Sequence, residues 1–580
     1  IKLDDRNPML SNSYNFKREY ATRSFNTVYA SFDIWKGIKF ASTFSYDFVM
    51  NKSRAWKDPR TSDGDDDNGR FSKDYNDITN MTWSNILTYQ TKIKKKHNLD
   101  LLVGYEINSK ESDGLGTTIS NFARWDKPEV NNGVVYQSMG GSNSTTRIVS
   151  YITRANYDYD NKYYLGASWR TDGSSRLARE NRWGNFWSLS GAWRVSSESF
   201  MKPLQNWLSD LKLRVSYGVN GTLPSSYYGY MGLSSLTSNY NDNPGITQSQ
   251  LENKELTWET NYNFNSGIDL GFFDNRLNVT FEYYVRTTKN LLYSRPLSLA
   301  TGFSSYLANI GKLQNKGYEL EIRSTNIETK DFRWSTSLNL GHNANKILKL
   351  DGDLKQVTSG TSIHKVGLPY STYYMIEFAG IDPADGEPMF YKNTTDENGN
   401  LNKETTKDPR SAEKVILQCA DPTITGGLGN SISYKWFDLN FNVNFSFGAW
   451  NYDGAAGKLE HGGDGTLNIP IYYRKRWQKE GDETSIERFV VGRSISMTDY
   501  ATTRRLYSGD YVRLKNLTFG FTLPKTWTRK VGIDNIRLYA SGNNLLTWAA
   551  YDYIDPESGS SPSWDTPPMR TYTFGLEVKF

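Results

Sequence analysis

The acidic stretch DGDDDNG at residues 63–69 is the strongest candidate for metal binding in the sequence. Asp63, Asp65 and Asp67 stand at alternating positions, as the oxygen ligands of a calcium-binding loop do. The sixth position, where such loops need glycine, is an asparagine, and the bidentate glutamate usual at the twelfth position is missing. We interpret the stretch first as a solvated acidic loop, and a structural calcium ion is the alternative.

The residues that usually perform catalysis are few and widely separated. No HExxH, CxxC, GxSxG or P-loop spacing occurs, so we expect no enzyme activity and no cofactor. One cysteine excludes an internal disulfide, and a net charge of +5 over 580 residues gives no sign of nucleic-acid binding. The residues concerned are His97, His342, His364, His461 and Cys419.

Aromatic residues in one long polar segment are candidates for binding a substrate. Trp450, Tyr452, Tyr472 and Tyr473 are expected to be exposed there, and their rings would stack on sugar rings. The same side chains would equally well pack the loop together or contact a partner protein. The sequence leaves these alternatives open.

Strict alternation of apolar and polar residues predicts β-strands, and these strands must position the candidate residues named above. Residues 437–447 read FDLNFNVNFSF, which only a strand sorts into one apolar and one polar face. The polar partners in this and similar stretches would line a watery interior, while the apolar ones would face lipid. The predicted interior residues are Asn440, Asn442, Asn444, Glu282, Arg286 and Glu577.

The pattern repeats from end to end and predicts a transmembrane antiparallel β-barrel of about 17 strands. No apolar run of about 18 residues occurs, which excludes a membrane-spanning helix. Short turns alternate with long polar segments, as periplasmic turns alternate with extracellular loops in outer-membrane barrels. The long segments lie near residues 51–79, 112–142, 220–254, 349–423 and 449–509.

The direction of the strands indicates whether residues 1–580 form a complete barrel. If residue 580 ends a strand in the periplasm, the first strand, near residues 24–34, also descends and begins outside the cell. A complete single-chain bacterial barrel has an even number of strands. We therefore expect residues 1–580 to be the C-terminal portion of a larger barrel.

Several stretches resemble the SusC/RagA family of TonB-dependent outer-membrane transporters of Bacteroidetes-type bacteria, and they keep the order found in that family. They are RTDGSSR (170–176), WGNFWSLSGAWRVS (183–196), WLSDLKLRVSYGVNG (207–221), NIGKLQNKGYELEI (309–322), FAGIDPADGEP (378–388), GDYVRLKNLTFGFTLP (509–524) and IRLYASGNNLLTW (536–548).

The resemblance implies a barrel of about 22 strands around a plug domain that this sequence does not contain. It further implies a SusD-like surface lipoprotein as a lid, and energy from the TonB complex through an N-terminal segment that is also absent here. The expected function is import of oligosaccharides across the bacterial outer membrane. Import of oligopeptides is the alternative, and a siderophore or cobalamin transporter or a passive porin is less expected.

Overall fold

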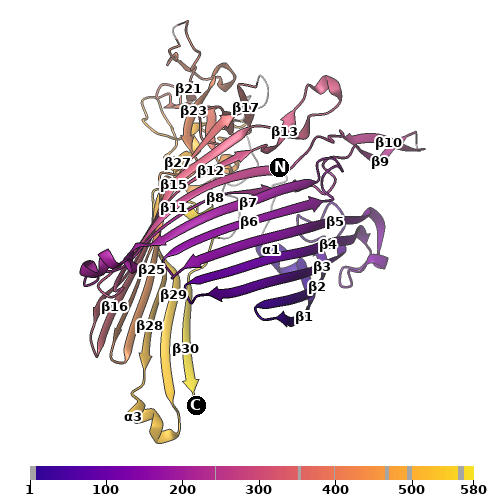
Figure 1. The fold of residues 1–580 in the computed structure, drawn as a ribbon. Coiled ribbons are helices and arrows are strands. Elements are labelled where there is room, and N and C mark those ends of the chain that lie inside the picture. The colour runs from indigo at the N-terminus through magenta and orange to yellow at the C-terminus, as the bar shows by residue number, and fades with distance from the viewer. Residues whose placement is uncertain are drawn as a thin grey trace. The chain divides into compact units, whose positions relative to one another are not determined.

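The computed structural model describes residues 8–241, 243–350, 354–397, 399–463, 469–492, 500–558 and 567–580. The fold is all-β, and its main sheet has 17 antiparallel strands (Figure 1), which confirms the predicted fold class and strand number. The strands of the main sheet are β1 (Phe16–Trp35), β2 (Ile38–Lys57), β3 (Arg70–Ile93), β4 (His97–Phe122), β5 (Gly133–Tyr159), β6 (Tyr163–Ser174), β7 (Trp183–Arg194), β8 (Leu208–Thr222), β11 (Glu259–Phe272), β12 (Leu277–Lys289), β15 (Lys312–Glu328), β16 (Phe332–Lys349), β24 (Ile424–Tyr434), β25 (Phe437–Phe447), β28 (Tyr511–Thr522), β29 (Asn535–Ala549) and β30 (Thr571–Lys579).

Smaller elements fill the long connections. None of the helices among the described residues is long and apolar enough to cross a membrane. The short strands are β9 (Leu233–Tyr240), β10 (Asn243–Gln250), β13 (Leu292–Pro296), β14 (Ser305–Asn309), β17 (Gln356–Ser359), β18 (Ser362–Lys365), β19 (Thr372–Ile376), β20 (Phe378–Ile381), β21 (Pro388–Tyr391), β22 (Thr405–Thr406), β23 (Lys414–Cys419), β26 (Trp450–Tyr452) and β27 (Leu506–Ser508). The helices are α1 (Pro8–Tyr14), α2 (Gly454–Leu459) and α3 (Lys525–Thr528), with 3₁₀ turns η1 (Val130–Asn132), η2 (Val195–Ser197), η3 (Ser199–Leu204), η4 (Leu299–Thr301), η5 (Pro409–Ser411), η6 (Ile471–Lys475), η8 (Thr503–Arg505), η9 (Arg529–Val531) and η10 (Pro556–Ser558).

The first two long connections contain fewer residues than the alternation of apolar and polar residues predicted. Residues 58–69 join β2 to β3, and residues 123–132 join β4 to β5, where the sequence suggested 51–79 and 112–142. At the ends of these strands next to the connections, apolar and polar residues do not alternate regularly, so the residues pair as strands but show no period of two in the sequence. The hairpin β13–β14, between β12 and β15, was not predicted.

The chain divides into two compact units. Unit 1 comprises residues 1–191, 216–262 and 288–310, and unit 2 comprises the rest. Apolar clusters lie near strand ends in each unit rather than in one central core. Trp56, Phe71, Ile119 and Phe122 form one such cluster in unit 1, and Val195, Met201 and Leu208 form one in unit 2.

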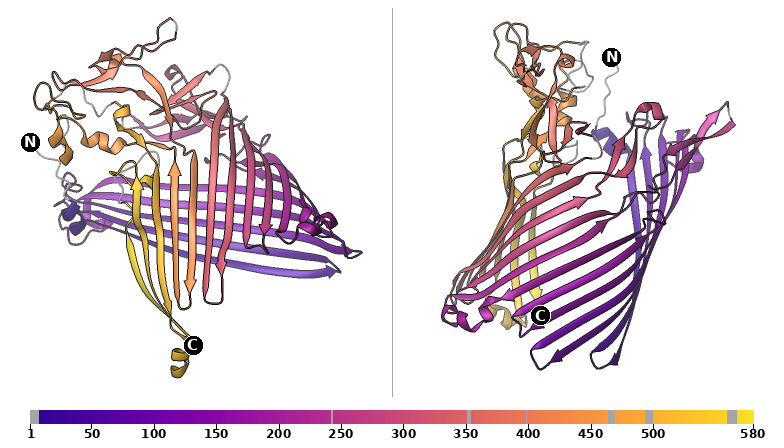
Figure 2. Two further views of the ribbon diagram at one scale, coloured as in Figure 1. Left: turned by 90° about the vertical axis from the view of Figure 1, so that its left-hand side faces the viewer. Right: turned by 45° about the horizontal axis from the view of Figure 1, so that its top comes forward.

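Short turns in the main sheet contain pairs of residues with a left-handed backbone. Between β5 and β6, Asp160 and Asn161 have φ values of 54° and 55°. Between β3 and β4, Lys94 and Lys95 have φ values of 49° and 61°. Two successive positive φ values match the twist of the flanking strands in a tight hairpin. In unit 2 the long connections lie at one end of the strands and α3 at the other (Figure 2, left).

Register in unit 2 sorts side chains into rows that cross the strands. Directly paired residues of antiparallel strands share a face. One row, from β15 to β29, is aliphatic, and the next row is dominated by polar groups. The aliphatic row is Ile322, Leu338, Leu428, Val443, Leu514 and Leu546, and the polar row is Arg323, Ser337, Gly429, Asn442, Asn516 and Asn543.

Candidate functional site

Among the residues that the structure describes, two cavities on the polar face of unit 2 follow one another along the strands. The cavity nearer the long connections has a volume of about 590 Å³. The cavity nearer the short turns has a volume of about 330 Å³. Polar residues lining the larger one are Thr280, Glu282, Glu319, Glu321, Asn339, Thr425, Asn444, Ser446 and Tyr511, and those lining the smaller one include Arg276, Asn278, Arg323, Ser335, Ser337, Asn440 and Asn442.

The larger cavity is rich in hydrogen-bond acceptors. Glu282 pairs with Arg214, and Asp269 lies 3.1 Å from the same guanidinium, so one cation is shared by two carboxylates. Glu321 lies 2.5 Å from Arg323. The backbone of Glu319 pairs with that of Gly341, but within the described part of the chain its side chain makes no hydrogen bond or ion pair. Carboxylate, amide and hydroxyl groups together can accept from and donate to a ligand with many hydroxyls.

The six residues predicted to line the interior lie on strands of the main sheet. Asn444 and Glu282 line the larger cavity, and Asn440 and Asn442 line the smaller one. Their orientation toward a watery interior stays a prediction. Of the other two, Arg286 donates from Nε to Asn263 at 2.9 Å, and Glu577 lies 4.0 Å from Arg537.

A glycine lets an ion pair form across β28. Arg537 on β29 reaches Asp438 on β25 at 2.7 Å, passing over Gly520. A Cβ at Gly520 would lie 2.3 Å from Asp438 Oδ1 and 2.7 Å from Arg537 Nη2. The bidentate pair therefore requires glycine at this position.

The long connections of unit 2 pack together into what we call the loop body, the described parts of residues 354–423, 449–510 and 550–558. Its segments are far apart in the sequence but are joined by backbone and side-chain contacts. These contacts are a parallel bridge between Ile376 and Thr502, a hydrogen bond of 2.9 Å from Trp477 Nε1 to the Pro383 carbonyl, and one of 2.9 Å from the Tyr551 hydroxyl to Asp453 Oδ2.

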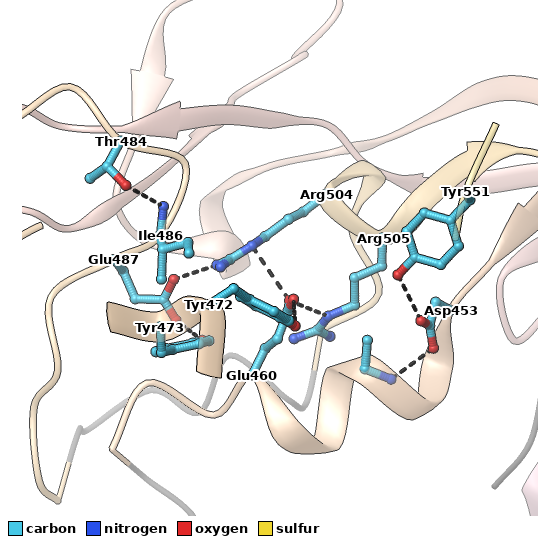
Figure 3. Close-up of polar contacts among 11 residues, drawn as sticks. Asp453, Glu460, Tyr472, Tyr473, Thr484, Ile486, Glu487, Arg504, Arg505 and Tyr551 are labelled. Carbon is cyan, nitrogen blue, oxygen red and sulfur yellow. Dashed lines mark hydrogen bonds and ion pairs between the residues drawn. The ribbon is translucent and has the colours of Figure 1, made fainter. Parts of the chain in front are cut away.

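A buried charge network holds the loop body together (Figure 3). Arg504 Nη1 lies 2.5 Å from Glu487 Oε2, and its Nε lies 3.6 Å from Glu460 Oε2. Arg505 Nε lies 3.4 Å from the same Glu460 oxygen. The Glu487 side chain is completely buried, and those of Arg504 and Arg505 are 12% and 5% exposed. Two cations and two carboxylates thus neutralise one another out of water.

Two phenols complete this network. The Tyr472 hydroxyl donates to Glu460 Oε1 at 2.6 Å, and the Tyr473 hydroxyl donates to Glu487 Oε1 at 2.9 Å. Burial and the adjacent carboxylates raise the pKa of both phenols. Although burial opposes the charge on Arg504, the carboxylates of Glu487 and Glu460 raise the pKa of its guanidinium. Arg504 therefore stays charged, and Tyr472 and Tyr473 stay protonated.

The four predicted binding aromatics all lie in the loop body. Trp450 and Tyr452 belong to β26, paired with β27, and are half-buried. Tyr472 is also half-buried, but Tyr473 is 1% exposed, which differs from the exposure expected from the sequence. The Tyr473 ring is buried in the loop body, where its hydroxyl donates to the buried carboxylate of Glu487. A role of these residues in binding substrate stays a prediction.

Three further tyrosines of the loop body were missed by sequence reasoning. The rings of Tyr507 and Tyr551 stack with centroids 3.7 Å apart, and Tyr553 contacts Tyr551 at 5.3 Å and Tyr472 at 5.6 Å. The only local signal was the Tyr-Asp-Tyr spacing at 551–553, which is uninformative without knowledge of its neighbours.

The histidines and the cysteine are scattered through the structure. His97 Nδ1 lies 2.8 Å from the Tyr157 hydroxyl, and His342 Nδ1 lies 2.7 Å from the Thr423 carbonyl. The other three lie in the loop body: His364 stacks on Tyr370, His461 is buried and accepts from the backbone of Gly463, and Cys419 ends β23.

The family model described as "TonB dependent receptor-like, beta-barrel" matches residues 2–545. The chain belongs to this family. It is also 30% identical to the TonB-dependent receptor SusC of Bacteroides thetaiotaomicron over 75% of this chain and 44% of SusC. The resemblance to the SusC/RagA family is thereby confirmed, and with it a location in the outer membrane. Members of this family are transporters rather than enzymes.

Other relatives agree along nearly the whole chain. TonB-dependent receptor P3 of Formosa agariphila is 32% identical over 95% of this chain and 57% of that protein. The solved structure titled "Structure of the RagAB peptide transporter" matches 99% of this chain and 63% of its own chain, with 26% identity and a TM-score of 0.89. The chain thus spans less than two thirds of the length of these relatives.

The acidic stretch that the sequence singled out forms the turn between β2 and β3 of this family member. Asn68 has a left-handed φ of 46°, the conformation that glycine provides in a calcium loop. Within the described ranges, no group of three or more acidic, histidine or cysteine side chains is arranged to hold a metal. Binding of calcium stays a prediction. Asp65 is exposed, Asp63 accepts from Asn15 at 3.3 Å, and Asp67 pairs with Arg70 at 3.2 Å.

The stretch FAGIDPADGEP, which contributed to the family resemblance, forms the hairpin β20–β21. Lys407 Nζ lies 2.7 Å from both Asp382 and Asp385 at its tip. Hydrogen bonds from Lys407 lower the pKa of both carboxyl groups. Their ionised forms therefore stabilise the folded hairpin.

This ion cluster predicts acid sensitivity of the hairpin. Because the folded pKa values are depressed, the stabilisation is present at neutral pH and is lost as the pH falls through them, below about pH 4. Hydrogen-exchange protection of residues 378–391, corrected for intrinsic rates, should fall in that range. In Lys407→Met the protection should be lower at neutral pH and less dependent on acid. Identical pH profiles for the two proteins would contradict this account.

Proposed function

We propose that the complete protein to which this chain belongs imports oligosaccharides across the outer membrane. The observation that carries the proposal is the larger cavity on the polar face of unit 2. Its lining combines carboxylate, amide and hydroxyl side chains with the ring of Tyr511, a mixture suited to the hydroxyls and the CH faces of a sugar. Membership of the SusC/RagA family supports a transport role.

We further propose that a SusD-like lipoprotein covers the loop body and that the TonB complex energises transport. The buried ion network makes the loop body a firm surface, which reduces the ordering cost of binding a partner. A plug domain and a TonB-contact segment would belong to the complete protein. Transport would then be gated conformational work on the plug rather than bond chemistry.

Uptake by living cells tests the proposal. Cells carrying the complete gene should accumulate labelled oligosaccharides, and deletion of the gene should abolish this uptake. A proton-motive-force uncoupler should stop it as well. Uptake that continues with the uncoupler would indicate a passive porin, and uptake of iron chelates or cobalamin instead would indicate a different transporter class.

Import of oligopeptides is the second candidate, because the fold matches the RagAB peptide transporter with a TM-score of 0.89. Carboxylates of the larger cavity would then receive the cationic groups of a peptide. Competition decides between the two: unlabelled oligosaccharides should suppress uptake of labelled ones, whereas a mixture of oligopeptides should not. Suppression by peptides alone would favour the second candidate.

A further inference from the structure

The segment between β29 and β30 presents one exposed tyrosine between two anchors. On one side, Tyr551 donates to buried Asp453 at 2.9 Å. On the other, Arg513 on β28 lies 2.6 Å from Asp555 and 2.7 Å from Glu557. The Arg513 side chain is 2% exposed. Tyr553, between these anchors, is 70% exposed.

Contacts with other tyrosines also hold the exposed ring of Tyr553 in place. Tyr553 packs edge-on against Tyr472 and at a tilt against Tyr551, which in turn stacks on Tyr507. Tyr472 is held by its hydrogen bond to Glu460 in the buried ion network. An aromatic ring that is exposed but already immobilised loses little conformational entropy when a ligand packs on it.

Arg513 links the anchored segment to a residue that lines the larger cavity. Arg513 lies over the ring of Tyr511, with 5.9 Å between its Cζ and the ring centroid. Tyr511 lines that cavity. Arg513 thus connects the segment that carries Tyr553 to the wall with Glu319, Asn339 and Asn444. All of these residues belong to unit 2.

We propose that Tyr553 is a sugar-binding residue in the loop-body segment that Arg513 links to the larger cavity, and that its exposed face stacks on the CH face of a pyranose ring. The inference rests on the proposed oligosaccharide import and names a residue for it. Asp552, the preceding residue in the sequence, is also exposed, and its carboxylate can accept hydrogen bonds from sugar hydroxyls. Stacking gives affinity without selecting one linkage, which suits the first contact with an extended chain.

Binding measurements on the complete protein test this assignment. The protein would be purified from outer membranes with any lipoprotein that accompanies it, and titrated with linear oligosaccharides of glucose, xylose and mannose. Tyr553→Ala should weaken binding of the recognised oligosaccharide by about tenfold, the size expected for one stacking contact. Tyr553→Phe keeps the ring and should bind as the wild type does.

A matched control removes another exposed tyrosine. Tyr240 on the β9–β10 hairpin is 84% exposed, and Tyr240→Ala should leave binding unchanged. The thermal unfolding midpoint of each variant shows whether the fold is retained. Wild-type affinity in a folded Tyr553→Ala protein would overturn the assignment while leaving oligosaccharide import intact. If the wild type binds oligopeptides and none of the three sugars, the assignment and oligosaccharide import are both overturned.

Discussion

Replacing Arg504 with methionine is expected to open the loop body while the main sheet stays folded. The substitution keeps much of the side-chain volume but leaves the fully buried Glu487 carboxylate without its cation. Removing one partner of a buried ion pair costs about 3–5 kcal/mol. Because Arg504 also contacts Glu460 and packs 5.5 Å from the Phe378 ring, both long connections should loosen together. Limited proteolysis should then cut within residues 469–492 and 500–508 faster than in the wild type.

Two variants separate lost charge pairing from lost packing. The double substitution Arg504→Met with Glu487→Leu removes both charges and should recover much of the protease resistance. Tyr473→Phe keeps the ring but removes one hydrogen bond to Glu487, which costs about 1–3 kcal/mol and should give intermediate resistance. If Arg504→Met is cleaved no faster than the wild type, the network does not hold the loop body together.

The fold of the main sheet was predictable because each strand carries its own evidence. In β25 the alternation of Phe441, Val443 and Phe445 with asparagines fixes which side chains share a face. Register then follows, since a shift of one residue would move every apolar group to the polar face. Strand ends such as Lys73–Asp74 were missed because their polar residues carry no such alternation.

The interior of the loop body was not predictable from local pattern. Tyr551 and Asp453 are 98 residues apart, and Arg488 and Glu387 are 101 residues apart. The residues that flank either member of such a pair in the sequence give no indication of its partner. The aromatic candidates could be chosen from the sequence, but whether each ring is buried or exposed depends on contacts that only the structure shows.

The loop body and the main sheet are stabilised by different kinds of interaction, and the candidate site depends on residues of both. The sheet supplies rows of polar groups at fixed spacing, which line the cavities. The loop body supplies immobilised rings such as Tyr553, held by charges that are costly to bury unless paired. A change in the loop body should therefore alter recognition of substrate while leaving assembly in the membrane unaffected.

Substituting arginine for Val443 is expected to prevent assembly of the barrel in the outer membrane. Val443 sits in the aliphatic row between Leu428 and Leu514, on the face that we assign to lipid. An arginine on the lipid face near the bilayer midplane costs about 2–4 kcal/mol. On electrophoresis without boiling, the folded wild-type barrel should give a heat-modifiable band. In the Val443→Arg variant this band should be lost, and the protein should be degraded in cells.

The adjacent residue on β25 provides the matched comparison. Asn442 points to the opposite face and pairs with Gly429 and Asn516 in the polar row. Asn442→Arg adds the same charge and bulk one residue away, but into surroundings that contain water, amides and hydroxyls. Assembly of this variant should be close to that of the wild type. Equal losses of assembly for the two variants would refute the assignment of faces, and with it the placing of the cavities in a watery interior.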